Sequence, residues 1–401
     1  MALAVVALLA LAGGSLHAQE TEMPGGVEKT AKPRLAAPIR IVAFSPDGKS
    51  LAVGGGVKEG PGQIILWDIA TRKLVWQESL PRGTYSLAFA PDGKILAVTC
   101  LQPDVRLLDA ATGKTRLTWI GPAKGVWPVA FSSDGKTLAG GGLDGTIKLW
   151  DVSSGKERLT MVGHQGQVLS IALSPDGKLL LSGGDDYIAR LWNLETGKEV
   201  RTMPRFGSIV RGVGFSRDGR WFAVGAWDGL LRIYDCVSGT VRTKIQYGSV
   251  DCLDFAPDNR TLVVCGVDSG QVRIYRLDLQ DPNPQESRRI QELLAALDND
   301  SYLVREKASG QLKGLGLIAV PELEKATKAA SVEVRVRARS ILAEVRSPSP
   351  WALLKGGTGE IRTAVFSPDG KMIASGSREG EVKLWDVASQ KAVATLEPAN
   401  Q

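Results

Sequence analysis

The sequence predicts a mainly β fold of repeated four-stranded antiparallel sheets, stacked radially around a common centre. A phrase close to Phe-Ser-Pro-Asp-Gly-Lys occurs seven times, at spacings of 40 to 45 residues apart from one gap of 111. Its copies begin at Phe44, Phe89, Phe131, Leu173, Phe215, Phe255 and Phe366. A fixed period of this length is the mark of a repeat architecture, and the long gap indicates an insertion of about 70 residues between the last two copies.

The third unit, residues 126–160, shows how one repeat divides into strands. An apolar run ends at Phe131, a Ser-Asp-Gly turn follows, and a second strand resumes at 137–139, where we expect the glycines at 140–142 to end it. A second turn precedes a third strand at 147–150, and residues 157–161 form a fourth. Short strands separated by regular turns are typical of an antiparallel meander. One such sheet cannot cover both of its faces, so each is expected to pack on the next.

A second marker recurs about 20 residues after each phrase, and it is an aromatic residue followed by an acid. The pairs are Trp67-Asp68, Trp150-Asp151 and Trp385-Asp386, with the variants Trp192-Asn193 and Tyr234-Asp235 and the altered copies Leu108-Asp109 and Tyr275-Arg276. Spacing and phase of both markers resemble the WD-repeat family, whose units end in Trp-Asp. The resemblance implies a seven-bladed β-propeller. It leaves open whether the outer strand of the last blade comes from 392–396 or from 32–37.

The resemblance also implies a buried hydrogen-bond network in one blade. The fourth unit alone carries the full set of residue types, which are His164, Ser182, Asp186 and Trp192. A fully connected polar network stabilises a core, so we interpret these residues as structural and not as catalytic.

The residues between the sixth and seventh units change from a period of 2 to one of 3.6, which predicts helices. Their expected packed faces contain Ile290, Leu293, Leu294 and Leu297; Leu303, Val304, Ala308 and Leu312; Leu323 and Ala326; and Val332, Val334, Val336, Ile341, Leu342 and Val345. Residues 298–301 are expected to cap the second helix. The run 304–308 recurs at 334–338, and the segment resembles a pair of HEAT-type helical hairpins.

These patterns predict five parts of the chain. They are a signal peptide at 1–18, a flexible leader at 19–38, propeller blades one to six (in part) at 39–281, a HEAT-like helical insert at 282–350, and the end of blade six with blade seven at 351–398. The insert would replace the turn between the third and fourth strands of blade six. Its alternating Arg335, Arg337 and Arg339 are interpreted as a solvated face, with a basic docking ridge as the alternative.

The first residues are apolar and end in a small-residue cleavage motif before Gln19, which predicts export to the periplasm or outside the cell. No basic residue precedes the apolar run, so an uncleaved N-terminal membrane anchor is the alternative. No membrane span is expected in the mature chain. The 49 basic and 43 acidic residues form no long run of like charge, so a nucleic-acid partner is not expected. A monomer is favoured.

The reactive residue types are few. His164 is the only histidine after the predicted cleavage site, which argues against a Ser-His-Asp triad, a metal centre or another cofactor site. Cys252 and Cys265 flank one turn and could face each other across two strands, either as a disulfide or as buried thiols. We therefore expect a protein that is not an enzyme. A periplasmic propeller enzyme of the lactonase or lyase type and a ligand-sensing domain are the alternatives, and metal analysis would separate the enzyme from the scaffold.

Partner binding is expected at the rim around the central opening. By the resemblance, the residue four positions before each phrase lies near this rim. These residues are Arg40, Tyr85, Trp127, Leu169, Arg211, Asp251 and Arg362. Arginine and aromatic residues dominate the energetics of interfaces. The sequence thus predicts an exported protein–protein interaction scaffold that binds a peptide or acidic segment there, and the helical insert is a second candidate surface. The alternative is that these residues only pack between blades.

Overall fold

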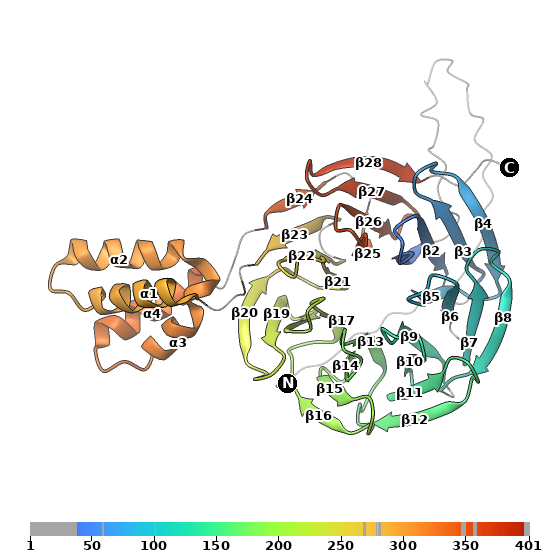
Figure 1. The fold of residues 1–401 in the computed structure, drawn as a ribbon, viewed down its shortest axis with the longest axis horizontal. Helices are drawn as coiled ribbons and strands as arrows, with labels where there is room; N and C mark the ends of the chain where they lie inside the picture. The colour runs from blue at the N-terminus through green and yellow to red at the C-terminus, as the bar shows by residue number, and fades with distance from the viewer. Residues whose placement is uncertain are drawn as a thin grey trace, which may run out of the picture. The chain divides into compact units, whose positions relative to one another are not determined.

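The computed structural model describes residues 38–396, except for 58–59, 101, 123, 268–269, 278, 280–281, 346–349 and 356–358. In this part of the chain, seven four-stranded antiparallel sheets form a ring of blades (Figure 1). The predicted seven-bladed β-propeller is confirmed. The predicted signal peptide and almost all of the predicted leader lie outside the described residues.

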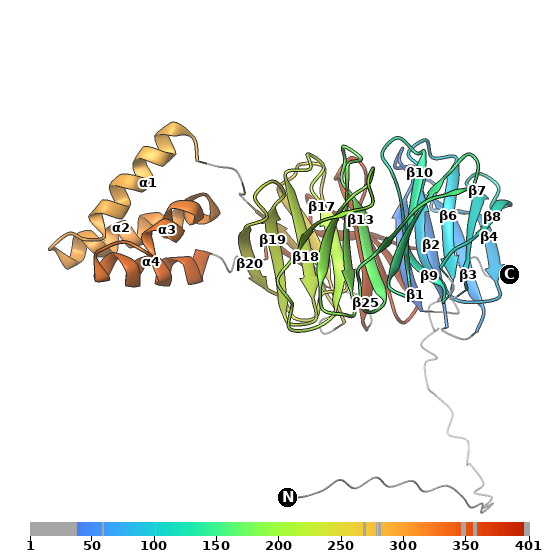
Figure 2. The ribbon, with the colours of Figure 1, turned by 90° about the horizontal axis from the view of Figure 1, so that it is seen from below.

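The four strands of each sheet follow one another in chain order, from the centre of the ring to its outer edge (Figure 1). Blades one to four contain β1 (Ile39–Phe44), β2 (Ser50–Gly56), β3 (Gly62–Asp68), β4 (Leu74–Leu80); β5 (Thr84–Phe89), β6 (Ile95–Cys100), β7 (Asp104–Asp109), β8 (Thr115–Ile120); β9 (Val126–Phe131), β10 (Thr137–Gly142), β11 (Thr146–Asp151), β12 (Glu157–Val162); and β13 (Val168–Leu173), β14 (Leu179–Gly184), β15 (Ala189–Asn193), β16 (Glu199–Thr202). Blades five to seven contain β17 (Val210–Phe215), β18 (Trp221–Ala226), β19 (Leu230–Asp235), β20 (Val241–Gln246); β21 (Cys252–Phe255), β22 (Thr261–Cys265), β23 (Val272–Arg276), β24 (Ala352–Leu354); and β25 (Ile361–Phe366), β26 (Met372–Ser377), β27 (Val382–Asp386), β28 (Lys391–Leu396). Seen from the side, the strands run between the two faces of the ring (Figure 2).

The repeated phrase forms the turn between the first and second strands of a blade. In blade one, Oδ1 of Asp47 accepts hydrogen bonds from Oγ of Ser45 at 2.6 Å and from the backbone N–H of Lys49 at 3.0 Å. Gly48 has φ of 71°, which residues with a side chain rarely adopt. The same Ser–Asp hydrogen bond recurs in blades three, four, five and seven. The aspartates of the phrase therefore hold turns.

The prediction that glycines end the second strand of blade three is wrong, because β10 continues through Gly142. Side chains have no room at these positions. A Cβ atom on Gly141 would lie 2.6 Å from Cγ1 of Val168 in the next blade, and one on Gly140 would lie 2.7 Å from the ring of Trp150. Glycine at these positions of β10 therefore leaves room for the side chains of neighbouring strands.

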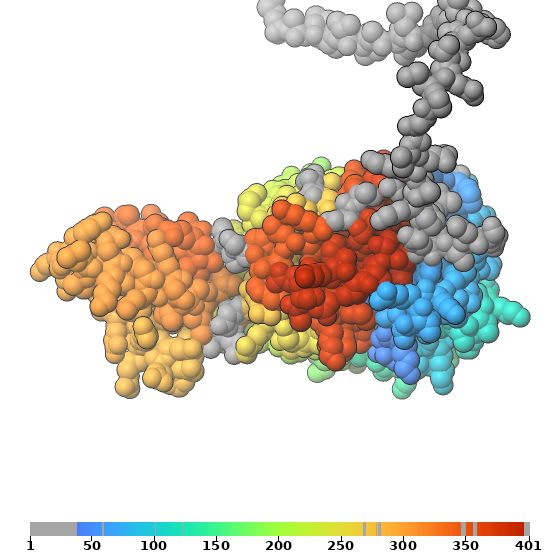
Figure 3. Space-filling view, turned by 90° about the horizontal axis from the view of Figure 1, so that it is seen from above, coloured from blue at the N-terminus to red at the C-terminus, as the bar shows by residue number. Residues whose placement is uncertain are grey.

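Blade seven supplies all four of its own strands. β28 pairs with β27, with Ala392 opposite Trp385, so residues 392–396 form the outer strand. The competing segment 32–37 lies outside the described residues. Side-chain packing closes the ring, because Ile39 of β1 shares a buried cluster with Leu384 and Leu396 of blade seven. The surfaces of blade seven (red) and blade one (blue) meet in Figure 3.

The described residues between β23 and β24 form helices. These are α1 (Pro284–Ala296), α2 (Tyr302–Gly314), α3 (Val320–Ala326) and α4 (Val332–Val345), with a 3-10 turn at Gly316–Ala319. β23 pairs with β24, with Ile274 opposite Ala352, so the helices interrupt blade six between its third and fourth strands.

Two arginines make equivalent contacts thirty residues apart. Arg305 donates hydrogen bonds to the carbonyl oxygens of Asn299 and Asp300, and Arg335 donates to those of residues 329 and 330. The internal repeat noted in the sequence is therefore a repeat of contacts as well. The HEAT-type interpretation stays a prediction.

Two expectations for the helices are wrong. Ser301 precedes α2, but its side chain makes no capping hydrogen bond. Apolar residues expected on packed faces are exposed instead, and these are Leu303, Val304, Val332 and Val336. In α2 the buried residues include Ala308 and Leu312. Leu303 lies five residues before Ala308, which places it about 140° away around the helix.

Candidate functional site

Six of the seven predicted rim residues lie at an irregularity in the innermost strand of their blade. The pairing of the first two strands shifts around Arg40, Tyr85, Leu169, Arg211 and Arg362. In blade three the shift spans Trp127 and Pro128, which oppose the single residue Gly141. In blade six, Asp251 precedes β21 and donates its backbone N–H to the carbonyl of Cys265 at 3.0 Å. Such β-bulges bend a strand and redirect a side chain.

All seven rim residues line one cavity of about 240 Å³. The first strands of the blades surround the centre of the ring (Figure 1), so seven equivalent positions face the same space. The structure thus brings together every residue of the predicted rim. Whether they bind a partner stays a prediction.

Arginine and aromatic side chains stack in a row along the cavity wall. The guanidinium of Arg40 lies 4.3 Å from the ring centre of Tyr85. The ring of Tyr85 meets that of Trp127 edge to face at 5.0 Å, and the guanidinium of Arg211 lies 5.7 Å from the centre of the Trp127 ring. Cation–π and edge-to-face contacts hold these side chains in place, so the cavity wall is preorganised.

Asp251 is the one carboxylate among the cavity-lining residues of the described chain. Its Oδ1 lies 3.4 Å from Nε of Arg211 and accepts a hydrogen bond from Nε1 of Trp227 at 2.9 Å. Its Oδ2 lies 4.0 Å from a guanidinium nitrogen of Arg362. Burial raises the pKa of Asp251, and the positive charge of Arg211 opposes that rise without cancelling it.

Positive charge exceeds negative charge in this cavity. Arg362 also pairs with Glu360 at 2.7 Å, whereas Arg40 pairs with no carboxylate in the described part of the chain; its Nε donates to the carbonyl of Gly56 at 3.1 Å. Burial lowers the pKa of Arg40, and the positive charges of Arg362 and Arg211 lower it further. Mutual repulsion of guanidinium groups favours an anion between them.

Trp227 and Cys252 belong to this region but were not predicted there. Trp227 follows the end of β18, and its ring lies 5.5 Å from the guanidinium of Arg211. Cys252, the first residue of β21, lines the cavity. Trp227 follows the second strand, whereas the offset used for the rim, four residues before the phrase, points only to the first strand and the residue before it. Cys252 directly follows the predicted rim residue Asp251, and this position in the sequence could have indicated that Cys252 lies at the cavity.

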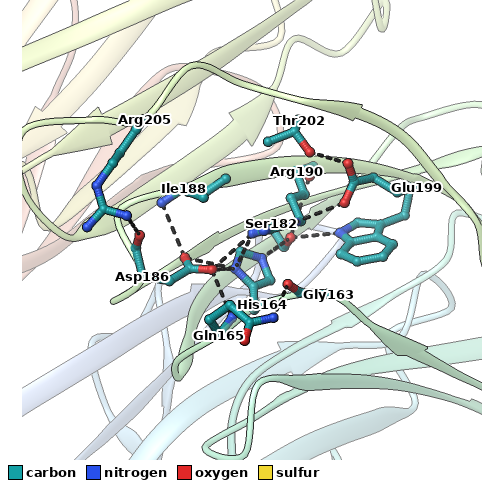
Figure 4. A network of polar contacts seen from close by, with 11 residues as sticks. Gly163, His164, Gln165, Ser182, Asp186, Ile188, Arg190, Glu199, Thr202 and Arg205 are labelled. Carbon is teal, nitrogen blue, oxygen red and sulfur yellow. Dashed lines mark hydrogen bonds and ion pairs between the residues drawn. The ribbon is translucent and has the colours of Figure 1, made fainter.

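The predicted polar network is assembled in blade four (Figure 4). His164 Nδ1 lies 3.0 Å from both carboxylate oxygens of Asp186, and its Nε2 lies 2.7 Å from Oγ of Ser182. Nε1 of Trp192 donates to the same Oγ at 2.8 Å. Every donor and acceptor in this chain of contacts has a partner when Nδ1–H of His164 donates to Asp186 and the Ser182 hydroxyl donates to Nε2 of His164. His164 and Ser182 are buried, which suits a structural role.

Arg190 is a further member of the network that the sequence did not reveal. It is buried, donates to Asp186 at 3.0 Å and lies 3.1 Å from Glu199. Burial alone would raise the pKa of Asp186, but the hydrogen bond from His164, the backbone N–H of Gln165 and the charge of Arg190 lower it to about 2. The carboxylate is therefore held charged inside the blade.

Two other blades contain parts of this arrangement. In blade seven, Nε1 of Trp385 donates to Oγ of Ser375 at 2.8 Å. In blade one, Val53 occupies the position of that serine, and Nε1 of the buried Trp67 has no hydrogen-bond partner among the described residues. The serine and the indole act as a pair even without the histidine.

Other sites considered from the sequence give these results. All four cysteines are free thiols, and Cys252 lies directly opposite Cys265. In the described residues, no three His, Cys, Asp or Glu side chains cluster closely enough to hold a metal ion, and no helix is both long and apolar enough to cross a membrane. Arg337 of α4 pairs with Glu306 and Glu333, and this favours a solvated face over a basic docking ridge.

Comparison with known proteins agrees with the fold. The family model "WD domain, G-beta repeat" matches residues 113–151, 155–193, 197–235, 240–276 and 349–386. Each matched range covers the last strand of one blade and the first three strands of the next.

Two curated proteins match a short stretch of the chain. They are the small ribosomal subunit protein RACK1z of Arabidopsis thaliana and the small ribosomal subunit protein RACK1 of Brassica napus, each 48% identical over 44 residues. That stretch is 11% of this chain and 14% of either relative, so it says little of their whole length. The five matched repeats and the seven blades together show that the chain is a WD40-repeat protein folded as a seven-bladed β-propeller.

Proposed function

We propose that this propeller is a protein-interaction scaffold that binds an acidic segment of a protein partner in the central cavity. A WD40 propeller suits such a role. The observation that carries the proposal is the excess of guanidinium groups, because Arg40, Arg211 and Arg362 line a cavity whose lining includes the single carboxylate of Asp251. Arginine binds carboxylates through paired, charge-assisted hydrogen bonds.

The aromatic side chains support the same proposal. Tyr85 and Trp127 are fixed by their contacts with each other and with Arg40 and Arg211. Rigid aromatic and arginine side chains lose little conformational entropy when a partner binds, and they dominate binding energies when enclosed. An extended acidic segment with an apolar residue would engage both kinds of side chain.

The experiment uses fluorescein-labelled peptides of equal length that are rich in Glu, Gln or Lys. Anisotropy should rise with the Glu-rich peptide and stay low with the other two. The double variant Trp127→Ala/Arg211→Ala should lose this binding while it stays folded, because Asp251 keeps the hydrogen bond from Trp227 and the charge of Arg362. Its melting temperature is measured to confirm that the variant is folded. The proposal fails if the three peptides bind equally well or if the double variant binds as the wild type does.

A matched control exists in blade six. Arg276 lies 3.6 Å from the ring of Trp351, away from the cavity lining. The variant Arg276→Ala/Trp351→Ala removes the same two residue types and the same charge. It is expected to bind the Glu-rich peptide as the wild type does.

We also infer a second interaction surface on the helices between β23 and β24. Tyr302 and Leu303 of α2 and Val332 and Val336 of α4 are exposed apolar residues, and such residues are common at protein interfaces. The proposal can be tested by affinity capture with the full chain and with a variant that lacks 282–350. Equal recovery of every partner by both proteins would contradict it.

Export is proposed on the sequence alone. The apolar run and the small-residue motif before Gln19 support a cleaved signal peptide. N-terminal sequencing of the protein from its native cell is expected to start at Gln19 in the exported fraction. A chain that keeps Met1 and stays with the membrane would favour the uncleaved anchor.

A further inference from the structure

Two cysteines face each other at the edge of the central cavity. Cys252 begins β21, Cys265 ends β22, and the two are direct partners in the antiparallel pairing of these strands. Directly opposite residues point to the same face of a sheet, with their Cβ atoms about 4.5–5.5 Å apart. A disulfide needs Cβ atoms about 3.5–4.5 Å apart, so a small movement of the two strands would allow the bond.

The two thiols differ in access. Cys252 is part of the cavity lining and is partly exposed, whereas Cys265 is fully buried. A small reagent in the cavity would therefore reach the sulfur of Cys252 first. Sγ of Cys252 lies 3.5 Å from the carbonyl oxygen of Ala364 in the next blade, so this sulfur sits between blades six and seven.

The two thiols also differ in reactivity. A hydrogen bond from the Cys265 thiol lowers the pKa of Cys252, while burial holds the pKa of Cys265 well above its usual value. The thiolate is the nucleophilic form of cysteine. Cys252 is thus both the accessible and the more reactive member, and Cys265 is placed to attack it in turn.

We propose that Cys252 and Cys265 form a peroxide-sensitive thiol pair that is oxidised through the central cavity to a disulfide between β21 and β22. The oxidant is hydrogen peroxide, which is small enough to enter the cavity. The Cys252 thiolate attacks one peroxide oxygen and the O–O bond breaks, which leaves a sulfenic acid and hydroxide. The Cys265 sulfur then attacks the sulfenic sulfur while its thiol proton passes to the departing hydroxyl, so the S–S bond forms, the S–O bond breaks and water leaves. The two thiols supply the two electrons that reduce one peroxide to two waters.

The cavity links this chemistry to the proposed function. Cys252 directly follows Asp251, and a segment seated on the arginines would cover it. An acidic peptide bound there should therefore slow oxidation of the pair. This second expectation rests on the proposed function, whereas formation of the disulfide does not.

The test is a peptide map of the full chain after peroxide treatment and alkylation, without reduction. Trypsin places each cysteine in a separate peptide. These peptides are 95–106 for Cys100, 233–242 for Cys236, 245–260 for Cys252 and 261–273 for Cys265. We expect 245–260 and 261–273 to appear as one linked species that reduction separates. Alkylated, unlinked Cys252 and Cys265 peptides after treatment would overturn the proposal, as would irreversible oxidation of Cys252 with Cys265 still a thiol.

Variants assign the two roles. In Cys252→Ser no linked species should form and Cys265 should stay alkylatable, because the buried thiol is not reached. In Cys265→Ser the sulfenic acid on Cys252 should persist and be trapped by dimedone. Cys236→Ser is the control and should link 245–260 to 261–273 at the wild-type rate. If Cys265→Ser does not fold, Cys252→Ser still tests which cysteine reacts first. Oxidation of Cys265 in that variant would contradict the proposal that peroxide attacks Cys252.

The Glu-rich peptide tests the link to the cavity. At a concentration that saturates the anisotropy signal, it should slow disulfide formation several-fold, and the Lys-rich peptide should not. An unchanged rate under saturation would overturn oxidation through the cavity. Failure of the Glu-rich peptide to bind would count against the proposed function alone, because the linked species in the free protein would still establish the thiol pair.

Discussion

The polar network of blade four provides a quantitative test of how the blades are held together. Oγ of Ser182 is the only atom joining His164 to Trp192 in the network described above, with distances of 2.7 and 2.8 Å. Ser182→Ala leaves both a ring nitrogen and an indole N–H unpaired in a buried position. Each unpaired buried polar group costs about 1–3 kcal/mol, so the free energy of unfolding should fall by roughly 2–6 kcal/mol.

Blade seven offers the matched control. Ser375 holds the equivalent position, and its Oγ accepts a hydrogen bond from Trp385 with no histidine in contact. Ser375→Ala leaves one group unpaired, so it should cost about half as much as Ser182→Ala. Urea unfolding followed by tryptophan fluorescence measures both losses. Equal losses in the two variants would refute the reasoning, because His164 would then contribute nothing through Ser182.

Three further predictions concern buried or charged groups. Val53→Thr should destabilise the protein by about 1 kcal/mol less than Val98→Thr, the same change at the equivalent position of blade two. Only the threonine at 53 can accept a hydrogen bond from the indole of Trp67. The two free energies of unfolding are compared from urea unfolding midpoints. Asp251→Asn should tighten binding of the Glu-rich peptide, because it removes the one negative charge among the cavity-lining residues of the described chain. Equal or weaker binding by the variant in the anisotropy assay would contradict this. The pKa of Asp186 is lowered to about 2, so the stability that its carboxylate contributes should be complete above about pH 4 and lost as the pH falls toward 2. In Asp186→Asn, the free energy of unfolding should lack this loss between pH 4 and pH 2.

The blades could be predicted from the sequence because each unit repeats the same local chemistry. The turn of the phrase needs Asp47 and Gly48 at fixed positions, so repeating the turn in each blade gives the sequence a visible period. The indole of Trp192 marks the third strand in the same way. These signals depend on contacts within a few residues or within one sheet, so they can be read without knowing the fold.

Contacts between blades left weaker signals. Gly141 is required because Val168 of the next blade lies against it, and a single repeat gives no indication of that neighbour. The exposure of Leu303 depends on which face α2 buries. The cap of α1 is a local signal, since Asn283 and Glu286 stand three residues apart and form a capping box.

The candidate site was predictable in its residues and not in its geometry. A fixed offset from the phrase found Arg40, Arg211 and the other rim positions. The bulge that redirects each of these side chains is a property of strand pairing, and residue types at the bulge vary from arginine to leucine. Trp227 comes from a different strand connection, so the offset could not reach it.

The most direct test of the central claim is the affinity of the Glu-rich peptide for Arg40 variants. Arg40 pairs with no carboxylate in the described chain, so Arg40→Gln leaves no buried acid unpaired and should keep the melting temperature nearly unchanged. Loss of a charge-assisted hydrogen bond of about 1.5–3 kcal/mol should raise the Kd roughly ten- to hundredfold, and Arg40→Lys should recover part of that loss. A Kd that is the same for the wild type and Arg40→Gln would contradict binding of an acidic segment in the cavity.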